Sequence, residues 1–203
     1  MKLRFFSKVF SSLGMLAYLL VGCQTESGRE KVWDLHIQDQ GLSFISIGDR
    51  YTRLDSLDIP YKLTETAYTQ EQGYIWLVRE MFLDSGKVTF EGNYFKEESL
   101  NETDIQNSHL NRIRIESPQL SLPNGIKTGM TFKKLKEKLN DAELELILLN
   151  DYNIIDISAP EVSNAHFLFP CPDTLSVDSS SIVVQLPPTS LPENSLMEAI
   201  VIL

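Results

Sequence analysis

Two cysteines and three histidines are the side chains of this sequence best suited to nucleophilic or metal chemistry. His36, His109 and His166 are scattered, and neither a His-Glu-x-x-His motif nor the paired cysteines of a zinc site occur. His166 and Cys171 are the sole candidates for a base and a thiol nucleophile. However, alternation over residues 165–169 places His166 opposite the phenylalanines, and Cys171 stands between two prolines. We therefore expect an exposed histidine and an incidental thiol, with no metal site and no cofactor.

Carboxylates are the next candidates, because a pair of them can hydrolyse a glycosidic bond. Asp151 and Asp156 could form such a pair, although nothing distinguishes them among 28 Asp and Glu. Residues 150–153 have the composition of a calcium loop but lack its glycine and its closing glutamate, so we expect a turn. No Gly-x-Ser-x-Gly, phosphate-loop or dinucleotide-binding motif is present. The sequence thus predicts a protein that is not an enzyme.

Cys23 stands in a different context, at the end of the first apolar run of the chain. Three basic residues and no acid precede that run: Lys2, Arg4 and Lys8. Residues 9–20 are mostly apolar, and their length suits a secretory signal better than a spanning helix, which needs about 20 apolar residues. The run closes with Leu20-Val21-Gly22-Cys23.

These last four residues resemble the lipobox of bacterial lipoproteins. The resemblance implies that residues 1–22 are a cleaved signal peptide and that the Cys23 thiol receives a diacylglyceryl group, usually with a third chain such as palmitate on its amine. Two or more buried chains anchor a protein stably, at about 0.8 kcal/mol per methylene. Residues 23–31 then read as a lipidated tether, and Gln24 is no acidic retention signal, which favours the outer membrane. An ordinary cleaved signal and a retained membrane helix are the alternatives.

Cleavage after residue 22 leaves an acidic chain with 15 Lys and Arg against 28 Asp and Glu, a net charge of −13. This balance argues against a nucleic-acid partner, which requires clustered Lys and Arg, and against lying flat on an anionic membrane. If Cys23 is lipidated, Cys171 has no intramolecular partner, so stability must come from packing.

Alternating apolar residues predict antiparallel strands in two successive units, 32–120 and 121–203. The strands expected in the first unit cover 33–37, 42–47, 74–83, 87–94 and 110–115. Those in the second unit cover 144–149, 154–157, 165–169, 181–186 and 199–203. Each unit should also hold one short helix, from Tyr51 with Asp49 as its cap and from Phe132 with Thr131 as its cap. We expect an α+β fold of antiparallel sheets with one short helix per half.

The two halves share a spaced pattern. Ile45-x-x-Gly48-x-x-Tyr51-x-x-Leu54 matches Ile126-x-x-Gly129-x-x-Phe132-x-x-Leu135 at a constant offset of 81. The glycine suits a chain that turns sharply into a helix. Whether four matched positions reflect a tandem repeat or coincidence stays open.

The Ile-x-x-Gly-Met-Thr-x-x-x-Leu sequence of residues 126–135 resembles a helix-plus-sheet module of exported bacterial proteins. Its examples include the small lipoprotein of the outer-membrane barrel-assembly machinery and the tandem-repeat beta-lactamase inhibitory protein. The resemblance implies the module and a tendency to bind proteins, and it carries no functional residue over. The first copy departs from it, with Asp49 and Arg50 in place of Met130 and Thr131.

Together these features predict a lipid-anchored lipoprotein of the cell envelope that acts as a non-enzymatic protein-binding or assembly module. Its expected contacts are the membrane, through the lipid on Cys23, and an envelope protein partner. Two alternatives remain open, an envelope hydrolase and a glycan- or solute-binding accessory lipoprotein. The last predicts a row of exposed aromatic side chains.

Overall fold

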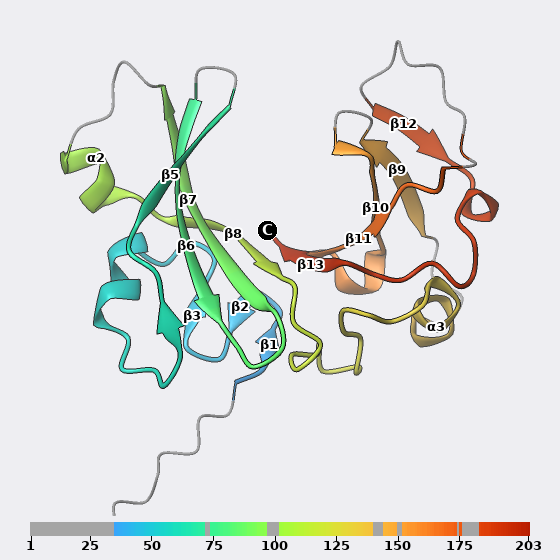
Figure 1. The fold of residues 1–203 in the computed structure, drawn as a ribbon, viewed down its shortest axis with the longest axis horizontal. Coiled ribbons are helices and arrows are strands. Elements are labelled where there is room, and N and C mark those ends of the chain that lie inside the picture. Colours follow the sequence, from blue (N-terminus) through green and yellow to red (C-terminus); the bar gives the residue numbers. More distant parts are fainter. Residues whose placement is uncertain are drawn as a thin grey trace, which may run out of the picture. The chain divides into compact units, whose positions relative to one another are not determined.

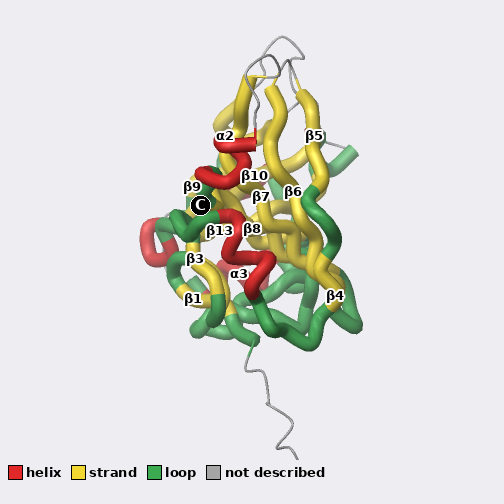
Figure 2. Tube along the Cα trace, turned by 90° about the vertical axis from the view of Figure 1, so that its left-hand side faces the viewer, coloured by secondary structure: helices red, strands yellow, loops and turns green. Residues whose placement is uncertain are grey.

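A computed structural model describes residues 35–71, 74–96, 102–139, 144–149, 152–173, 175 and 183–203. Residues Asp34–Leu203 form one compact unit, in which strands predominate and helices are few and short (Figures 1 and 2). The fold is therefore mostly β. The expected antiparallel sheets are confirmed, and the helical share of the expected α+β fold is smaller than predicted. Within these ranges no helix combines the length and the apolar character needed to cross a bilayer.

The described strands form one ten-stranded antiparallel sheet and one small three-stranded sheet. In spatial order the large sheet holds β12 Val183–Leu186, β9 Glu145–Leu149, β10 Ile154–Ser158, β11 Ala165–Pro170, β13 Ala199–Ile202, β8 Leu110–Ile115, β7 Lys87–Lys96, β6 Tyr74–Phe82 and β4 Lys62–Leu63, with β5 Ala67–Glu71 also on β6. The small sheet holds β1 Ile37–Gln38, β2 Gly41–Leu42 and β3 Ile45–Ser46. The two predicted units thus share one sheet.

The last strands of the two halves meet at the centre of this sheet (Figure 1). In β8 and β13, Arg114 lies opposite Val201, and the isoleucines on either side of each are paired with one another. Those four isoleucines are fully buried. Burial of one such side chain stabilises a fold by about 1.5–3 kcal/mol, so this junction holds the halves together.

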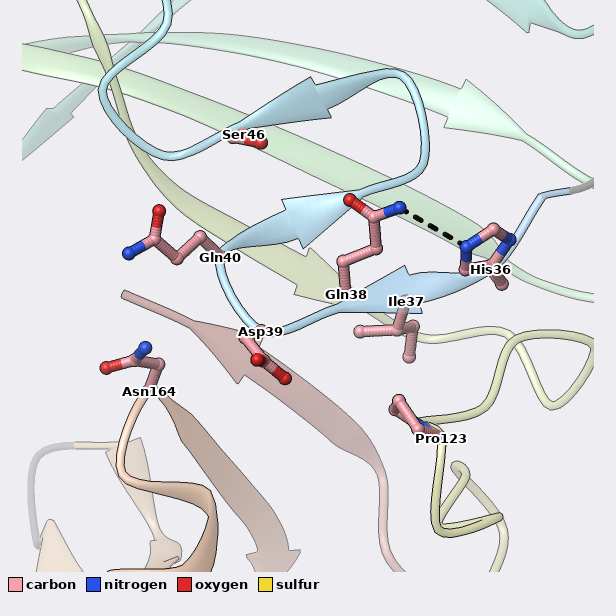
Figure 3. A pocket seen from close by; sticks show the side chains of 8 residues that line it. All are labelled: His36, Ile37, Gln38, Asp39, Gln40, Ser46, Pro123 and Asn164. Atoms are coloured by element: carbon pink, nitrogen blue, oxygen red, sulfur yellow. Dashed lines mark hydrogen bonds between the residues drawn. The ribbon is translucent and has the colours of Figure 1, made fainter.

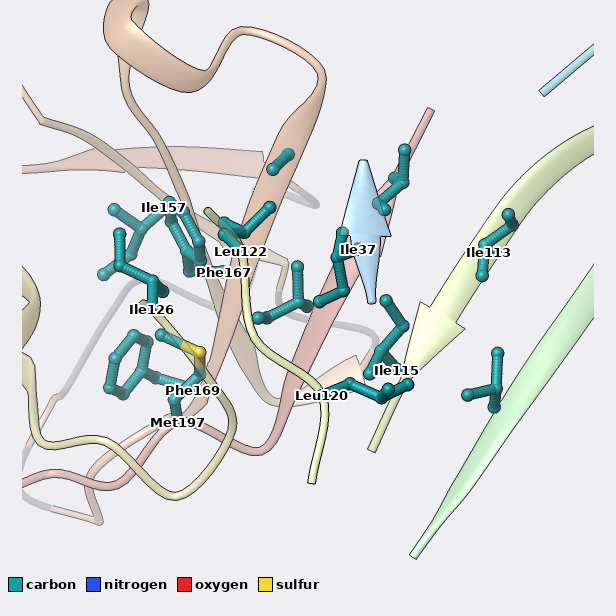
Figure 4. Close-up of a cluster of buried hydrophobic side chains, with 14 of the residues drawn as sticks. Ile37, Ile113, Ile115, Leu120, Leu122, Ile126, Ile157, Phe167, Phe169 and Met197 are labelled. Atoms are coloured by element: carbon teal, nitrogen blue, oxygen red, sulfur yellow. The ribbon is translucent and has the colours of Figure 1, made fainter. Parts of the chain in front are cut away.

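One face of the large sheet carries the hydrophobic core (Figure 4). Successive side chains of a strand point to opposite faces, and in β9 and β10 every second one is buried, as with Ile155 and Ile157 in β10. Residues from three other segments pack on this face: the small sheet, the short helix η1 (Tyr51–Ser56) and α3 (Phe132–Lys138). Leu120, Leu122 and Ile126, in the segment between the halves, complete the core.

The turn into η1 is fixed by backbone hydrogen bonds to the start of β8. Gly48 has a φ of 85° and donates its N–H to the Leu110 carbonyl at 2.7 Å. Leu110 donates in return to the Asp49 carbonyl at 2.8 Å, and Tyr51 donates to the Ser108 carbonyl at 2.8 Å. The strand therefore holds the residues that start the helix.

The turn into α3 repeats this arrangement. Gly129 has a φ of 76° and donates its N–H to the Met197 carbonyl at 2.8 Å. Met197 donates to the Met130 carbonyl at 2.9 Å, and Phe132 donates to the Ser195 carbonyl at 2.9 Å. Each bond matches one in the first half, between residues of the same relative positions.

The two predicted helices differ in kind. α3 has the expected cap, since Thr131 Oγ1 accepts a hydrogen bond from the Lys134 N–H at 3.3 Å. η1 is a 3-10 helix, and its N-cap is Arg50 without a side-chain bond, so the prediction of Asp49 as the cap is wrong. The Asp49 carboxylate instead accepts from the Ser46 N–H at 2.8 Å and pairs with the Arg53 guanidinium at 2.8 Å. The Asp49 carboxylate therefore binds the turn before η1 and not the N-terminus of that 3-10 helix.

Several elements of the first half differ from the expectation. Residues 42–47 form the antiparallel pair β2 and β3 rather than one strand, and β1 begins at Ile37. β4, β5 and the helix α2 (Glu102–Asn107) were not predicted. These segments are short, and short segments show too little periodicity to be recognised. The five strands of the second half and the hairpin of β6 and β7 lie where the alternation placed them.

The paired glycine turns give a stability prediction. A β-carbon added at Gly48 or Gly129 would meet no atom within 4 Å, so only the backbone conformation opposes it. A left-handed conformation costs about 1–2 kcal/mol for a residue other than glycine. We expect Gly48→Ala and Gly129→Ala each to lower the free energy of unfolding by that amount, measured by urea denaturation. Lys133→Ala, at an exposed helix position, is the control and should change it by less than about 0.5 kcal/mol. An unchanged midpoint for either glycine variant would contradict the expectation.

Candidate functional site

The face of the large sheet opposite the core is called the outer face here, and it carries the residues that alternate with the buried ones. Its part on β6, β7 and β8 is charged. Lys87 pairs with Glu80 and, at 3.8 Å, with Glu116, which also receives Arg114 at 3.1 Å. Arg112 pairs with Glu91 in the same way. The three cations and three carboxylates on this part neutralise one another.

The part of the outer face on β9 to β13 is largely apolar. Leu168, Ala199 and Val201 form a small cluster distinct from the main core, with exposed fractions of 8%, 0% and 7%, and Ile154 packs against it. Ile147 and Leu149 of β9 extend this cluster, because Leu149 lies opposite Ile154 and Ile147 lies opposite Asp156. The outer face therefore changes from charged to apolar between β8 and β13.

A histidine–aspartate pair stands within this apolar part. His166 Nδ1 lies 3.0 Å from both carboxylate oxygens of Asp156, across the pairing of β11 with β10. The hydrogen bond to Asp156 raises the pKa of His166 above its ordinary value; partial burial opposes this, and attraction to the aspartate charge adds to it. Asp156 thus favours the protonated imidazole and leaves Nε2 as the nitrogen for other contacts.

Beside the pair lies an open hollow of about 540 Å³. Five polar side chains line it, four from strands β9 to β12 and one from the turn before β11: Glu145, Ser158, His166, Gln185 and Ser163. Gln185 Nε2 lies 3.5 Å from a Glu145 carboxylate oxygen, and Ser158 lies opposite His166 in the register of β10 and β11. His166 Nδ1 is engaged by the Asp156 carboxylate and not by the Ser158 hydroxyl. The hollow can accept a cationic or hydrogen-bonding group.

A second hollow, of about 650 Å³, lies beside the small sheet (Figure 3). Its lining is largely polar and includes Gln40, Asp39 and Asn164. The side-chain amide nitrogen of Gln38 lies 3.3 Å from Nε2 of the His36 ring. No group of three or more His, Cys, Asp or Glu suited to a metal ion occurs in the described ranges. This hollow brings together polar groups of the small sheet with Asn164, the residue before β11.

The sequence-based candidates separate in the structure. His166 lies on the outer face as predicted, whereas Cys171 packs against the core, so the two do not meet. Burial, and to a smaller extent the Asp173 charge, raises the pKa of the Cys171 thiol, which disfavours the reactive thiolate. Asp151 and Cys23, with all of residues 1–34, lie outside the described residues.

The His166–Asp156 pair was not predicted from the sequence. Alternation places both side chains outward in their strands. Their contact also requires the register of β10 with β11, which puts Asp156 opposite Leu168 and therefore diagonal to His166. The signal that the sequence offers for this pair is one outward polar residue in each of two consecutive apolar strands, Asp156 and His166.

No protein-family model and no curated protein matches this chain. Among solved structures it is similar to the crystal structure of the uncharacterized protein YfeY from Escherichia coli. The similarity covers 82% of this chain and 98% of that one, with a TM-score of 0.51 and 14% sequence identity. At this identity the likeness shows the fold alone.

The raised pKa of His166 predicts a pH dependence. The folded state holds the His166 proton more tightly than the unfolded chain, whose histidine has a pKa of about 6.5. The stabilisation is therefore complete below about pH 6.5 and is lost as pH rises through the folded pKa. Asp156→Asn should lower the His166 pKa in an NMR titration and remove this component of the pH-dependent stability.

Ser158→Ala is the matched control, because it changes a neighbour of His166 without touching the pair. Its His166 titration should follow the parent protein. Equal His166 pKa values in the parent and in Asp156→Asn would show that Asp156 does not set this pKa.

Proposed function

We propose that this chain is a lipid-anchored lipoprotein of the bacterial cell envelope and acts there as a non-enzymatic protein-binding or assembly module. Residues 1–22 serve as the signal peptide, Cys23 carries the lipid, and residues 23–31 form the tether. The order of basic, apolar and Leu-Val-Gly-Cys segments supports the anchor. Gln24 supports the outer membrane.

The observation that carries the binding role is the apolar part of the outer face. Leu168, Ala199 and Val201 form an apolar cluster on the face of the sheet that does not carry the main core. That cluster is itself buried, but Ile147, Leu149 and Ile154 beside it are only half-buried, and apolar surface that stays exposed is typical of interaction sites. We therefore infer that this face of the sheet binds a protein.

The distribution of aromatic side chains favours a protein partner over a glycan. Several large aromatics of the described region, among them Tyr51, Phe90, Phe132 and Phe167, are fully buried, and Trp76 is half-buried. Phe82 and Tyr152 are exposed, but they belong to different halves of the chain, at the end of β6 and before β10. They do not make the row on which sugars stack.

We further propose that the two halves are tandem copies of one module. The three hydrogen bonds at each glycine turn support this, since they join corresponding residues in both halves. Corresponding residues are 81 positions apart at the two helices and 87 positions apart at the two last strands. Leu110 thus corresponds to Met197, and Ile113 to Ile200. The symmetric pairing of β8 with β13 is what two copies joined at their last strands would give.

Lipid attachment is tested by mass and fractionation in a Gram-negative host. The parent chain should partition with membranes, and its N-terminal peptide should begin at Cys23 and carry diacylglyceryl and acyl mass. Cys23→Ser should lose this added mass. Cys171→Ser, which changes the other thiol, should keep it. A parent protein that is freely soluble, retains Met1 and has no lipid mass would refute the anchor.

A further inference from the structure

Lysines gather in one short part of this acidic chain. Residues 127–138 hold five lysines and a single glutamate, and residues 139–203 contain no Lys or Arg. A chain that begins at Cys23 has 15 Lys and Arg, so a third of them stand within these twelve residues. The chain therefore combines a negative net charge with one basic region, around α3.

Four of the five lysines are exposed, and none of the four pairs with a carboxylate of the described ranges. They are defined here as the lysine face: Lys127, Lys133, Lys134 and Lys138. The fifth, Lys136, is half-buried, pairs with Glu193 at 3.1 Å and lies over the ring of Phe132 at 5.0 Å. The charges of the lysine face are thus available to anions from outside.

The lysine face is continuous from α3 to the turn that precedes it. Lys134 and Lys138 are four residues apart on α3 and so are neighbours on the helix surface. Lys138 Nζ donates a hydrogen bond to the Asn124 carbonyl at 3.0 Å, which holds this ammonium over the turn at residues 123–125. Lys127 follows that turn directly. The four charges therefore form one patch.

This patch lies beside the start of the described chain. Pro123, in the turn that Lys138 contacts, lines a hollow together with His36 and Ile37, and Figure 3 shows it next to Ile37. In Figures 1 and 2, β1 and α3 both lie at the end of the unit opposite α2. His36 is only thirteen residues after Cys23. A lipid on Cys23 would therefore keep this end of the unit close to the bilayer.

We infer that the lysine face binds the anionic headgroups of the bilayer that holds the Cys23 lipid. A lysine near an anionic surface contributes about fivefold to the partitioning of a protein onto that surface. Exposed ammonium groups spread over a helix and a turn match an array of phosphates better than they match one enclosed ion. The inference rests on the proposed anchor and adds the orientation in which the anchored unit stands.

The negative net charge of the chain is compatible with such a contact. Salt screens charges beyond about 8 Å at physiological ionic strength, so acids elsewhere in the unit act weakly on the headgroups. Among the described acids, Glu137 lies on α3 itself, and Glu193 is already paired with Lys136. The unit therefore touches the bilayer at one end and does not lie flat on it.

Contact through α3 leaves the outer face of the sheet uncovered. α3 packs on the core face of the sheet, with Phe132 and Leu135 buried, so its exposed lysines point away from the sheet. The half-buried apolar side chains of β9 and β10 then remain open to a protein partner. The same end of the unit faces the lipid while the opposite side of the sheet faces the partner.

The test uses the mature lipidated protein, with one chain in each nanodisc. One set of discs contains phosphatidylcholine alone, and the other contains equal amounts of phosphatidylcholine and phosphatidylglycerol. Neither lipid has an amine, so acetylation by an N-hydroxysuccinimide ester reports on lysines, each of which is followed by mass spectrometry. In the anionic discs the lysine face should react at least about fivefold more slowly. Lys87, on the outer face, should react equally in both, and high salt should abolish the difference.

Variants locate the contact. Lys133→Gln combined with Lys134→Gln removes two charges from the lysine face, and Lys127 and Lys138 should then react in anionic discs as they do in neutral ones. Lys133→Arg combined with Lys134→Arg is the matched control, because it keeps both charges and should keep the protection of Lys127 and Lys138. Both positions are exposed, so the urea midpoint of each variant should match that of the parent.

A second control separates a local contact from attraction by net charge. Arg50→Gln combined with Lys62→Gln also removes two exposed positive charges, both from the first half of the chain. It should leave the protection of the lysine face at the parent level. An equal loss of protection in this variant would mean that net charge alone draws the protein to the disc, and would overturn the inference.

Three further results would also overturn it. Equal reaction rates in the two kinds of disc would show that the lysine face does not touch the headgroups. Protection in both kinds would indicate a protein contact, and protection in neutral discs after addition of inorganic phosphate would indicate a site for a single anion. A chain without lipid would not enter the discs, and the anchor would fail with the inference. A chain that enters the discs and shows equal rates refutes the inference alone.

Discussion

The antiparallel pairing of β8 with β13 is the interaction on which the rest of this structure depends. It joins the strands of both halves into one sheet and aligns their buried faces, so that Ile113, Ile115, Ile200 and Ile202 all lie in the core. A shift of one residue in this register would turn those side chains outward. The register also fixes which residues share the outer face, and hence which of them can act together.

What the sequence predicted follows from the strength of each local signal. α3 was predicted with its cap because Phe132, Leu135 and Leu139 recur on one helical face, and all three are buried. The strands of the second half were predicted because each is a run of four or more mostly apolar residues. Residues 42–47 were predicted as one strand instead of two, because strands of two residues joined by a turn are too short to show a periodic pattern.

The candidate site was only partly predictable, because a strand's sequence determines faces and not neighbours. Alternation placed His166 on the outer face, which is correct. Its partner Asp156 could be identified only from the register of β10 with β11. The same limit explains why Cys171, close to His166 in sequence, was a candidate partner: separation along a chain says little about contact once one residue points to the core.

Different outer-face residues give the two halves different binding properties. Arg114 and Val201 face each other at the centre of the sheet and occupy corresponding places in β8 and β13. On the first side the surrounding charges satisfy one another, and exposed pairs of this kind add at most about 1 kcal/mol each. On the second side the cluster of Leu168, Ala199 and Val201 is already buried, and the half-buried Ile147, Leu149 and Ile154 beside it form the apolar surface that remains open to a ligand. If Cys23 holds the lipid, a tether of about 15–17 Å confines that surface to a thin layer beside the membrane. Confinement raises the effective concentration of any partner in the same layer, so a small contact would suffice there.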